Sequence, residues 1–293
     1  MEAFLENFDI FLLEAIISGV LLGGVLALLA LGLNLIFGVI DVTWICYAEL
    51  VMIGMYGMYY MVQVFGLPYW VAAPFAILLV AALGAALHYI VIAPLLNAPP
   101  INQLLATGGV LFILQSFATV AFGIDFRNLG IRLPVLSLGD MNFSYSRLLA
   151  FGAALAGMIA VYLFMTRTFT GTAIRAIAQD RQIMSLMGVD AKRIYVITSA
   201  LGGALAGLAA CLLVLQYDVH PFVGLSFGPI TFLICVLGGL GNFIGGFIAA
   251  FVFAEIISLG GLFSDLEWGY VLAFAFFIVM MFIRPAGLLA RRS

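Results

Sequence analysis

Two carboxylates, Glu49 and Glu255, lie inside segments of the chain that are otherwise strongly apolar. A carboxylate is expensive to place in a membrane, so one that occurs there commonly marks a path for a solute or an ion. The alternative is a structural carboxylate that is protonated or capped by a neighbouring helix. With both interpretations open, we treat Glu49 and Glu255 as candidate residues of a translocation path.

Thr107 and Gln115 are two further polar residues inside an apolar segment. The commoner role of such residues is hydrogen bonding between membrane helices, which holds the helices together. The alternative places both side chains on the same path as the carboxylates. We therefore keep Thr107 and Gln115 as candidates for the path as well.

Other constellations that could do chemistry are weak. GGLGNFIGG, residues 238–246, is rich in glycine, but no Gly-Lys-Ser/Thr follows it, so it predicts a tight turn between helices rather than a phosphate-binding loop. His88 and His220 are isolated, and the three cysteines lack the paired spacing of metal sites. The sequence therefore predicts no catalytic residues, no bound cofactor, no metal, and thiols that behave as small apolar side chains.

Membrane helices are the elements that must position these residues. Hydrophobic residues make up 66% of the chain, charged residues 9%, and the mean hydropathy is +1.25, far above the balance of soluble domains. A formal net charge of -3 excludes the basic surface of a nucleic-acid-binding protein. We predict an all-α polytopic membrane protein in a lipid bilayer, with residues 1–293 forming one domain.

Apolar segments of about 20 residues, the length that crosses a bilayer, recur along the chain. Glycine and proline separate them, as at Gly66-Leu67-Pro68. The N-terminus lacks the basic residues of a signal peptide, so the first apolar segment is expected to remain as a helix. The sequence predicts eight or nine crossings, at residues 12–38, 47–65, 69–92, 103–123, 147–166, 192–215, 225–240, 245–262 and 268–284.

Basic residues predict the orientation of the chain, because they are retained on the cytoplasmic side. One basic cluster lies within residues 167–193 and another within residues 284–292, with four predicted crossings between them. Both clusters are therefore expected in the cytoplasm, and the N-terminus outside. The loop at residues 124–146, which has fewer basic residues close to it, is then also outside.

The stretch GTAIRAIAQDRQIMSLMGVDAKRIY, residues 171–195, holds six charged residues. Apolar residues recur at roughly helical spacing over residues 172–187, which predicts a short amphipathic surface helix, interrupted around Asp180. Gly188 suits the left-handed position that ends a helix, and Asp190 suits the N-cap of the next one. An ordinary basic loop and a helix that docks a partner both explain this pattern, and periodicity does not separate them.

The same stretch resembles the cytoplasmic coupling region of LivH-type permeases, the membrane subunits of ABC importers for branched-chain amino acids and related solutes. The shared features are Gly171, Arg175-Ala176, Ala178-Gln179-Asp180 and Met187-Gly188. Similar stretches follow along nearly the whole chain, namely APPINQLLATGGVLFILQSF (98–117), VLGGLGNFIGGFIAAFVFAEI (236–256) and FIRPAGLLA (282–290).

This resemblance implies a coupling region at about residues 168–191 that seats in a groove of an ATP-binding subunit. The residues implied to take part are Gly171, Arg175, Ala176, Asp180, Arg181, Met187 and Gly188. The implied partners are a second related permease subunit in a heterodimer, two cytoplasmic ATP-binding subunits that hold ATP and magnesium, and a periplasmic or extracellular solute-binding protein. The implied location is a bacterial or archaeal plasma membrane, and the implied mechanism is alternating access without chemistry in this chain.

The segment DVTWICYAELVMIGMY, residues 41–56, departs from the family pattern Asn-Phe-Ala-His-Gly-Glu. Glu49 is kept, whereas Trp44 and Tyr47 stand in a stretch without the Asn, His and Gly. We therefore add Trp44 and Tyr47 to the candidate path. The resemblance implies branched-chain amino acids or a related small polar or aromatic solute, such as an amide, urea or an aromatic acid, as the transported solute. If residues 41–56 line the path, their departure from the pattern favours a solute larger or more aromatic than leucine. The alternative function is an ion-coupled secondary transporter that acts without ATPase partners.

Overall fold

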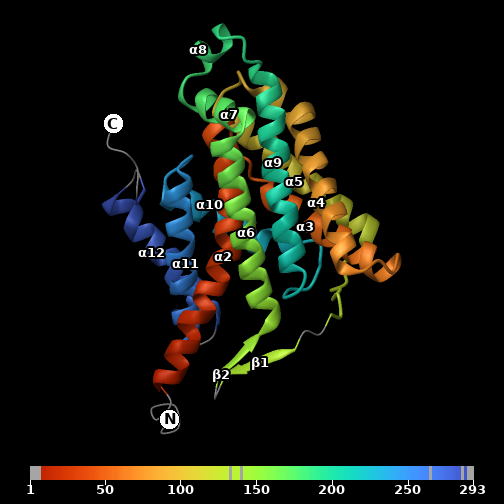
Figure 1. The fold of residues 1–293 in the computed structure, drawn as a ribbon, viewed down its shortest axis with the longest axis vertical. Helices are drawn as coiled ribbons and strands as arrows, with labels where there is room; N and C mark the ends of the chain where they lie inside the picture. The colour runs from red at the N-terminus through yellow and green to blue at the C-terminus, as the bar shows by residue number, and fades with distance from the viewer. Residues whose placement is uncertain (1–7, 132–133, 139–140, 264–265, 285–286, 289–293) are drawn as a thin grey trace.

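The computed structural model describes residues 8–131, 134–138, 141–263, 266–284 and 287–288. Most of these residues lie in helices that run along the long axis of the molecule (Figure 1). The first half contains α2 (Phe8–Ile40), α3 (Tyr47–Tyr59), η1 (Tyr60–Val64), α4 (Tyr69–Leu87), η2 (His88–Ile92), η3 (Ala93–Leu95) and α5 (Pro100–Phe122). The second half contains β1 (Val135–Leu138), β2 (Met141–Ser144), α6 (Tyr145–Arg167), α7 (Phe169–Gln179), α8 (Arg181–Leu186), α9 (Ala191–Leu213), α10 (Val223–Gly238), α11 (Phe243–Phe263) and α12 (Leu266–Ile283).

Each apolar segment predicted from the sequence coincides with a helix in the described part of the chain. Two predicted breaks are confirmed by left-handed glycines, Gly66 with a φ of 66° and Gly239 with a φ of 93°. Six helical segments in the described residues are long and apolar enough to cross a membrane, namely Asp9–Ile40, Tyr69–Leu95, Pro100–Phe122, Tyr145–Arg167, Ala191–Leu213 and Phe243–Leu262. The α10 and α12 helices are apolar but shorter. The chain is a helical membrane protein.

The loop predicted at residues 124–146 contains two short antiparallel strands, which the sequence analysis did not predict, in an otherwise helical fold. β1 and β2 pair with Val135 opposite Ser144 and Leu138 opposite Met141. The sequence Met-Asn-Phe-Ser of β2 alternates apolar and polar residues, a period of two that suits a strand. The hairpin lies beyond the helices, at the end of the molecule where the N-terminus lies (Figure 1).

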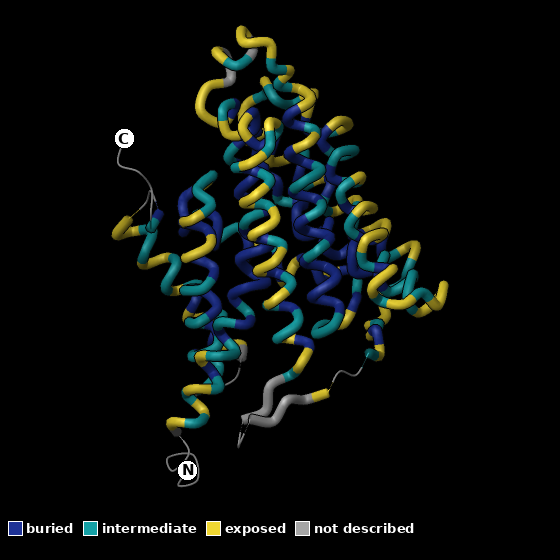
Figure 2. Tube along the Cα trace, in the orientation of Figure 1, coloured by how far each residue is buried: buried dark blue, intermediate teal, exposed yellow. Residues whose placement is uncertain are grey.

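The centre of the bundle is formed by α2 and α9, in which 67% of the most apolar window is buried, against 22% to 28% in α4, α5 and α6. Figure 2 shows the buried residues gathered along the middle of the molecule. Small residues let α9 approach α4 closely. A Cβ at Gly203 would lie 2.6 Å from the carbonyl oxygen of Val80, and one at Gly207 would lie 2.9 Å from the Cα of Ile77.

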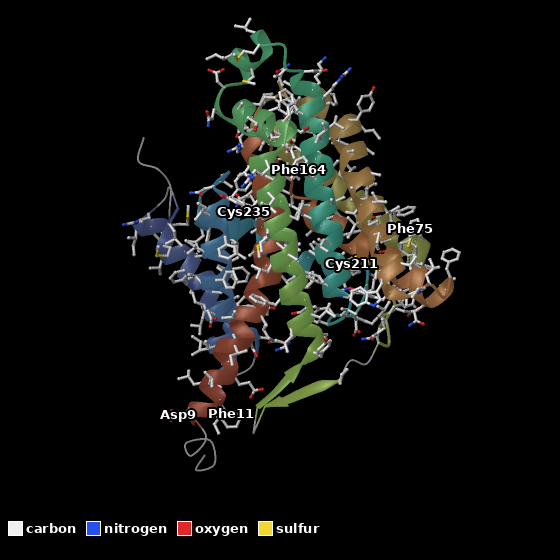
Figure 3. All side chains as sticks on the ribbon, in the orientation of Figure 1. Asp9, Phe11, Phe75, Phe164, Cys211 and Cys235 are labelled. Atoms are coloured by element: carbon white, nitrogen blue, oxygen red, sulfur yellow. The ribbon has the colours of Figure 1, made fainter. Side chains whose placement is uncertain are left out.

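The outer helices carry large apolar side chains on their exposed faces. Phe75 of α4 is 53% exposed and lies at the edge of the bundle, while Cys211 and Cys235 lie within it (Figure 3). The three cysteines are buried free thiols, as predicted. Exposed apolar side chains on α5, such as Phe112 and Val120, are suited to lipid rather than water.

Candidate functional site

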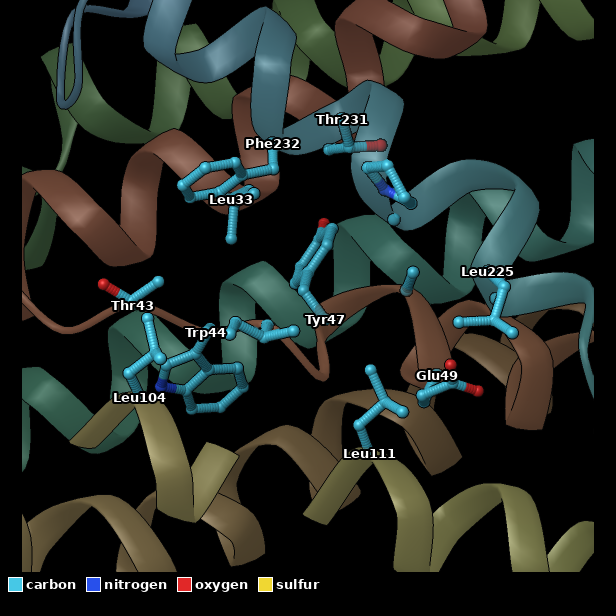
Figure 4. Close-up of a pocket in the computed structure, with 15 residues that line it drawn as sticks. Leu33, Thr43, Trp44, Tyr47, Glu49, Leu104, Leu111, Leu225, Thr231 and Phe232 are labelled. Carbon is cyan, nitrogen blue, oxygen red and sulfur yellow. The ribbon is translucent and has the colours of Figure 1, made fainter. Parts of the chain in front are cut away.

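A cavity of about 290 Å³ lies among α2, α3, α5 and α10 (Figure 4), and we call it the Glu49 pocket. The α3 helix begins at Tyr47 after a short linker. The linker and the first turn of α3 together form one wall of the pocket. The α10 helix supplies the facing wall with small residues at Gly224 and Gly228. The lining residues are Leu33, Thr43, Trp44, Ile45, Tyr47, Ala48, Glu49, Leu104, Leu111, Gly224, Leu225, Gly228, Pro229, Thr231 and Phe232.

Glu49 is the only acidic or basic residue among the described residues that line this pocket, and it is 1% exposed. Its Oε1 accepts a hydrogen bond of 3.0 Å from Gln115 Nε2 on α5. Its Oε2 is buried and has no hydrogen-bond partner in the described part of the chain. A buried carboxylate oxygen without a donor is unfavourable, so it marks a place where a ligand or water can bind.

Gly224 makes room for the Glu49 carboxylate. A Cβ at Gly224 would lie 2.5 Å from Oε1 and 2.6 Å from Oε2 of Glu49. Gly224 is in the first turn of α10, and the N-terminal end of a helix carries a partial positive charge. The carboxylate therefore lies against the end of a helix that favours negative charge.

Trp44 and Tyr47, two of the predicted path residues, both line the Glu49 pocket (Figure 4). The Tyr47 hydroxyl donates a hydrogen bond of 3.2 Å to the carbonyl oxygen of Gly202 on α9, so its ring rather than its hydroxyl is available to the pocket. Trp44 is 1% exposed, and its Nε1 has no hydrogen-bond partner within the described residues. Phe232 of α10, which the sequence analysis did not single out, is a third aromatic side chain of the lining.

Thr107 and Gln115 make the hydrogen bonds between segments that the sequence predicts as their commoner role. The Thr107 hydroxyl donates to the carbonyl oxygen of Thr43 at 2.9 Å, which ties α5 to the linker before α3. Gln115 reaches the pocket through its bond to Glu49. Neither residue is part of the lining of the Glu49 pocket, although Leu104 and Leu111 of the same helix are.

Glu255 is not brought together with Glu49. It lies on α11 against α2, where a Cβ at Gly19 would be 2.6 Å from Glu255 Oε2. Glu255 is partly exposed and is not among the residues that line the Glu49 pocket. The two carboxylates therefore occupy separate places in the bundle.

A second cavity of about 500 Å³ shares Leu225 and Pro229 with the Glu49 pocket, so the two are neighbours along α10. Its lining includes His220, whose Nδ1 accepts a hydrogen bond of 3.3 Å from the backbone N–H of Phe222. Burial lowers the pKa of His220, and the nearby Asp218 opposes this effect. Because neutral imidazole is needed to accept that bond, the pKa direction and the geometry agree.

Arg127 holds this second cavity's loops together, and sequence reasoning gave it no such role. Its Nη1 donates to the Tyr60 hydroxyl at 2.9 Å, and its Nη2 donates to the carbonyl oxygen of Phe122. Its backbone pairs with Val219 through N–H to oxygen distances of 2.9 and 2.8 Å. Arg127 thus joins the loop after α5 to the loop after α9.

The segment that the sequence predicts as one interrupted helix forms two, α7 and α8, at the end of the bundle away from the N-terminus (Figure 1). Asp180 stands between them with an extended backbone, and its Oδ1 accepts a hydrogen bond of 2.9 Å from the Ile183 N–H. A side chain that caps the following helix in this way ends the preceding one. The Gly188 stop is confirmed by a φ of 81°, and the Asp190 N-cap is confirmed by a bond of 3.0 Å from the Lys192 N–H.

The α7 helix is amphipathic, with Ala173, Ile174 and Ile177 buried against α2, α6 and α9. Gly171 allows this close packing, because a Cβ there would meet the backbone of Phe164 and Met165. Arg175 is on the exposed face.

The remaining coupling candidates lie around this face and the α8 tip. Ala176 is partly exposed, whereas Asp180, Met187 and Gly188 are exposed, with Met187 at 74%. The backbone of Arg181 begins α8, and its side chain lies outside the described parts of the structure.

Comparison with known proteins places the chain in a family. The family model described as branched-chain amino acid transport system / permease component matches residues 15–281. The chain is 28% identical to the high-affinity branched-chain amino acid transport system permease protein BraD of Pseudomonas aeruginosa, over 95% of this chain and 96% of BraD. It is 28% identical to the permease protein LivH of Escherichia coli, over 96% of each chain.

More distant proteins extend this similarity. A probable branched-chain amino acid transport permease protein LivH of Methanocaldococcus jannaschii is 25% identical over 92% of this chain and 90% of its own. The fold is similar to a chain of the solved structure "PsaBC from Streptococcus pneumoniae in complex with Fab", with a TM-score of 0.50 and 16% identity over 98% and 97% of the two chains. Since the family model spans most of the sequence, the chain belongs to the branched-chain amino acid transport system permease family.

Proposed function

We propose that this chain is the membrane-spanning permease subunit of an ATP-driven importer for branched-chain amino acids or a related small polar or aromatic solute. The observation that carries the proposal is the placement of α7. Its apolar face packs on α2, α6 and α9, while Arg175 is exposed at the end of the bundle. A surface helix held in this way can receive force from a partner and pass it to the core.

The route from α7 to the Glu49 pocket runs through α2 and α9, which both contact α7. The α2 helix supplies Leu33 to the pocket lining, and α9 accepts the hydrogen bond of Tyr47 at Gly202. A shift of α2 or α9 therefore changes the shape of the pocket. We infer that the solute passes the Glu49 pocket and that closure of the ATPases switches the side to which it opens.

Two cytoplasmic ATP-binding subunits are the proposed partners at the α7–α8 end. Three apolar side chains are exposed at the α8 tip, Ile183 at 55%, Leu186 at 88% and Met187 at 74%. Together with the exposed Arg175 of α7, these apolar side chains are suited to a groove with an acidic rim. ATP and magnesium would be bound by those subunits, and Gly171, Ala176, Asp180, Arg181 and Gly188 would shape the coupling segment.

A second related permease subunit and a solute-binding protein complete the proposed assembly. The opposite end of the bundle, with the hairpin and the N-terminus, would face outside the cell (Figure 1). In this arrangement the loops joined by Arg127 and Val219 are available to the binding protein. The α3, α10 and α12 helices would join the six longer ones in the membrane, which makes nine entries into the bilayer in total.

Co-purification tests this proposal. The full-length chain, expressed with a tag in its own cells and solubilised in mild detergent, is expected to bring down an untagged ATP-binding protein and a second permease at fixed stoichiometry. A chain that purifies alone and moves solute by itself with a cation gradient would instead support the ion-coupled secondary transporter.

A further inference from the structure

The Glu49 pocket contains an uncommitted hydrogen-bond acceptor. Gln115 occupies Oε1 of Glu49, and Oε2 is buried without a donor in the described part of the chain. Two other oxygens at the pocket already make hydrogen bonds within the protein. The Thr231 hydroxyl donates to the carbonyl oxygen of Phe227 at 2.7 Å, and the carbonyl oxygen of Thr43 accepts from Thr107. A ligand that supplies an N–H to Oε2 would complete the hydrogen bonding of the carboxylate.

The charge of the residues that line the pocket indicates which kind of ligand head group can bind there. Among the described residues that line the pocket there is no Lys, Arg or His, and the one charged side chain is Glu49. A carboxylate or phosphate head group would be buried beside a carboxylate without a counter-ion, which is strongly unfavourable. An ammonium or an amide N–H₂ would instead form a hydrogen bond that the carboxylate strengthens.

The volume of the pocket and its aromatic side chains indicate what the rest of the ligand is like. A cavity of about 150 Å³ lined by apolar side chains holds a benzene ring, and the Glu49 pocket has about 290 Å³. It therefore has room for an aromatic ring together with a head group of several atoms. The rings of Trp44, Tyr47 and Phe232 line it, and aromatic side chains favour aromatic ligands through stacked or edge-to-face contacts.

We propose that Glu49 binds the N–H-bearing head group of a solute whose aromatic or bulky apolar body packs against Trp44 and Phe232. The solute class is an aromatic amine or amide that carries no free carboxylate. The inference makes the Glu49 pocket a specificity site on the translocation path, and this part of it rests on the proposed function. The binding chemistry itself depends on the pocket alone.

The competing explanation is that Glu49 only ties α3 to α5 and α10. The contact with the first turn of α10 through Gly224 supports such a structural role. That role leaves Oε2 without a donor, and it predicts a change in stability without a change in ligand preference. Ligand preference therefore separates the two explanations.

Two nearly isosteric probes, 3-phenylpropionamide and 3-phenylpropionate, measure this preference, since they differ by one amide N–H₂ in place of one carboxylate oxygen. The full-length chain, in nanodiscs with any subunits that remain bound, is titrated with each probe in the absence of the solute-binding protein. The wild type is expected to bind the amide about ten- to a hundredfold more tightly, the usual value of a hydrogen bond to a charged group. Acetamide, which has no ring, is expected to bind far more weakly than 3-phenylpropionamide.

Glu49→Gln is the decisive variant, because it keeps an oxygen for Gln115 and removes the charge. It is expected to reduce the preference for the amide about tenfold, partly because the carboxylate probe binds better. Glu267→Gln, the same change at an exposed residue in the first turn of α12, is expected to keep the wild-type preference. Equal preference in the wild type and Glu49→Gln would overturn the inference.

Phe232→Leu tests the other half of the ligand and does not depend on the folding of Glu49→Gln. It is expected to weaken both phenyl probes by a similar factor of about five to ten, the loss of one aromatic contact, and to leave acetamide unaffected. Unchanged affinity for both phenyl probes would contradict the proposed placement of the ring. ATP-dependent uptake measured in parallel separates this inference from the proposed function. ATP-dependent uptake together with an unaltered probe preference in Glu49→Gln rejects this inference alone. Uptake that does not depend on ATP in the wild type rejects the proposed function alone.

Discussion

Gln115 of α5 and Glu49 of α3 are joined inside the bundle by a hydrogen bond of 3.0 Å from Nε2 to Oε1. Both side chains are buried, and this bond links α5 directly to α3, in addition to the bond from Thr107 to the linker before α3. In surroundings of low polarity such a bond is costly to break, because the carboxylate would lose the one donor that the described residues give it.

Gln115→Leu is therefore expected to lower the stability of the protein by about 1–3 kcal/mol and to reduce solute uptake. The melting temperature of the purified protein in nanodiscs measures the first effect. Thr119→Ala is the matched control, because the Thr119 hydroxyl donates a hydrogen bond within α5, to the carbonyl oxygen of Gln115. Equal melting temperatures for the two variants would show that the bond between α3 and α5 contributes nothing.

Gly224→Ala is expected to impair transport more than Gly228→Ala does. The new Cβ at residue 224 would lie 2.5 Å from Glu49 Oε1, whereas the one at residue 228 would lie 3.2 Å from the Cβ of Ala48. Overpacking of this kind costs about 1–3 kcal/mol, and at Gly224 it displaces the carboxylate as well. Uptake rates of the two variants at equal membrane expression provide the measurement, and equal rates would contradict the account of the pocket.

Arg175→Glu is expected to reduce solute uptake at least about tenfold while ATP hydrolysis continues, because it reverses a charge on the exposed face of α7. The packing of α7 is unaffected, since the buried face is formed by other residues. Arg167→Glu, at an exposed residue that ends α6, makes the same change outside the coupling segment. Normal uptake by Arg175→Glu, or an equal loss in both variants, would reject a specific coupling role.

His220 gives the loop after α9 a dependence on pH. Burial lowers its pKa in the folded protein, so the unfolded chain takes up a proton first as the pH falls. The stability that neutral His220 provides is complete above about pH 6.5 and decreases as the pH falls through that value. His220→Asn, which keeps an acceptor for the Phe222 N–H but does not titrate, is expected to show a smaller fall in melting temperature between pH 7.5 and 5.5. Parallel curves would show that His220 does not titrate with folding.

The helices were predictable because their signals are local. Long apolar segments, Gly66, Gly188 and the Asp190 cap each act within a few residues, and the structure has them where the sequence predicts them. The division of α7 from α8 was harder to predict, since Asp180 could continue a helix or cap the next one, and the choice depends on the packing of both neighbours. The β1–β2 hairpin was not predicted, because its two strands have four residues each and lie in a loop of mixed polarity.

The pocket was only partly predictable for a different reason. Glu49 and Gln115 were visible as polar residues in apolar segments, but their hydrogen bond joins residues of different helices. Gly224 and Phe232 belong to a helix whose sequence is mostly apolar, so no periodic signal indicated which face meets α3. Glu255 has the same sequence signal as Glu49, a carboxylate in an apolar segment, but it lies away from the Glu49 pocket.

Uptake by proteoliposomes tests the central claim most directly. The chain is reconstituted with the ATP-binding and permease subunits that co-purify with it, and the solute-binding protein is added outside with radiolabelled leucine and phenylalanine. Accumulation is expected only when ATP is enclosed in the lumen of the proteoliposomes, on the side of the ATP-binding subunits. It is expected to be lost in Arg175→Glu. Accumulation by the chain alone, driven by a proton or sodium gradient and insensitive to ATP, would contradict the account.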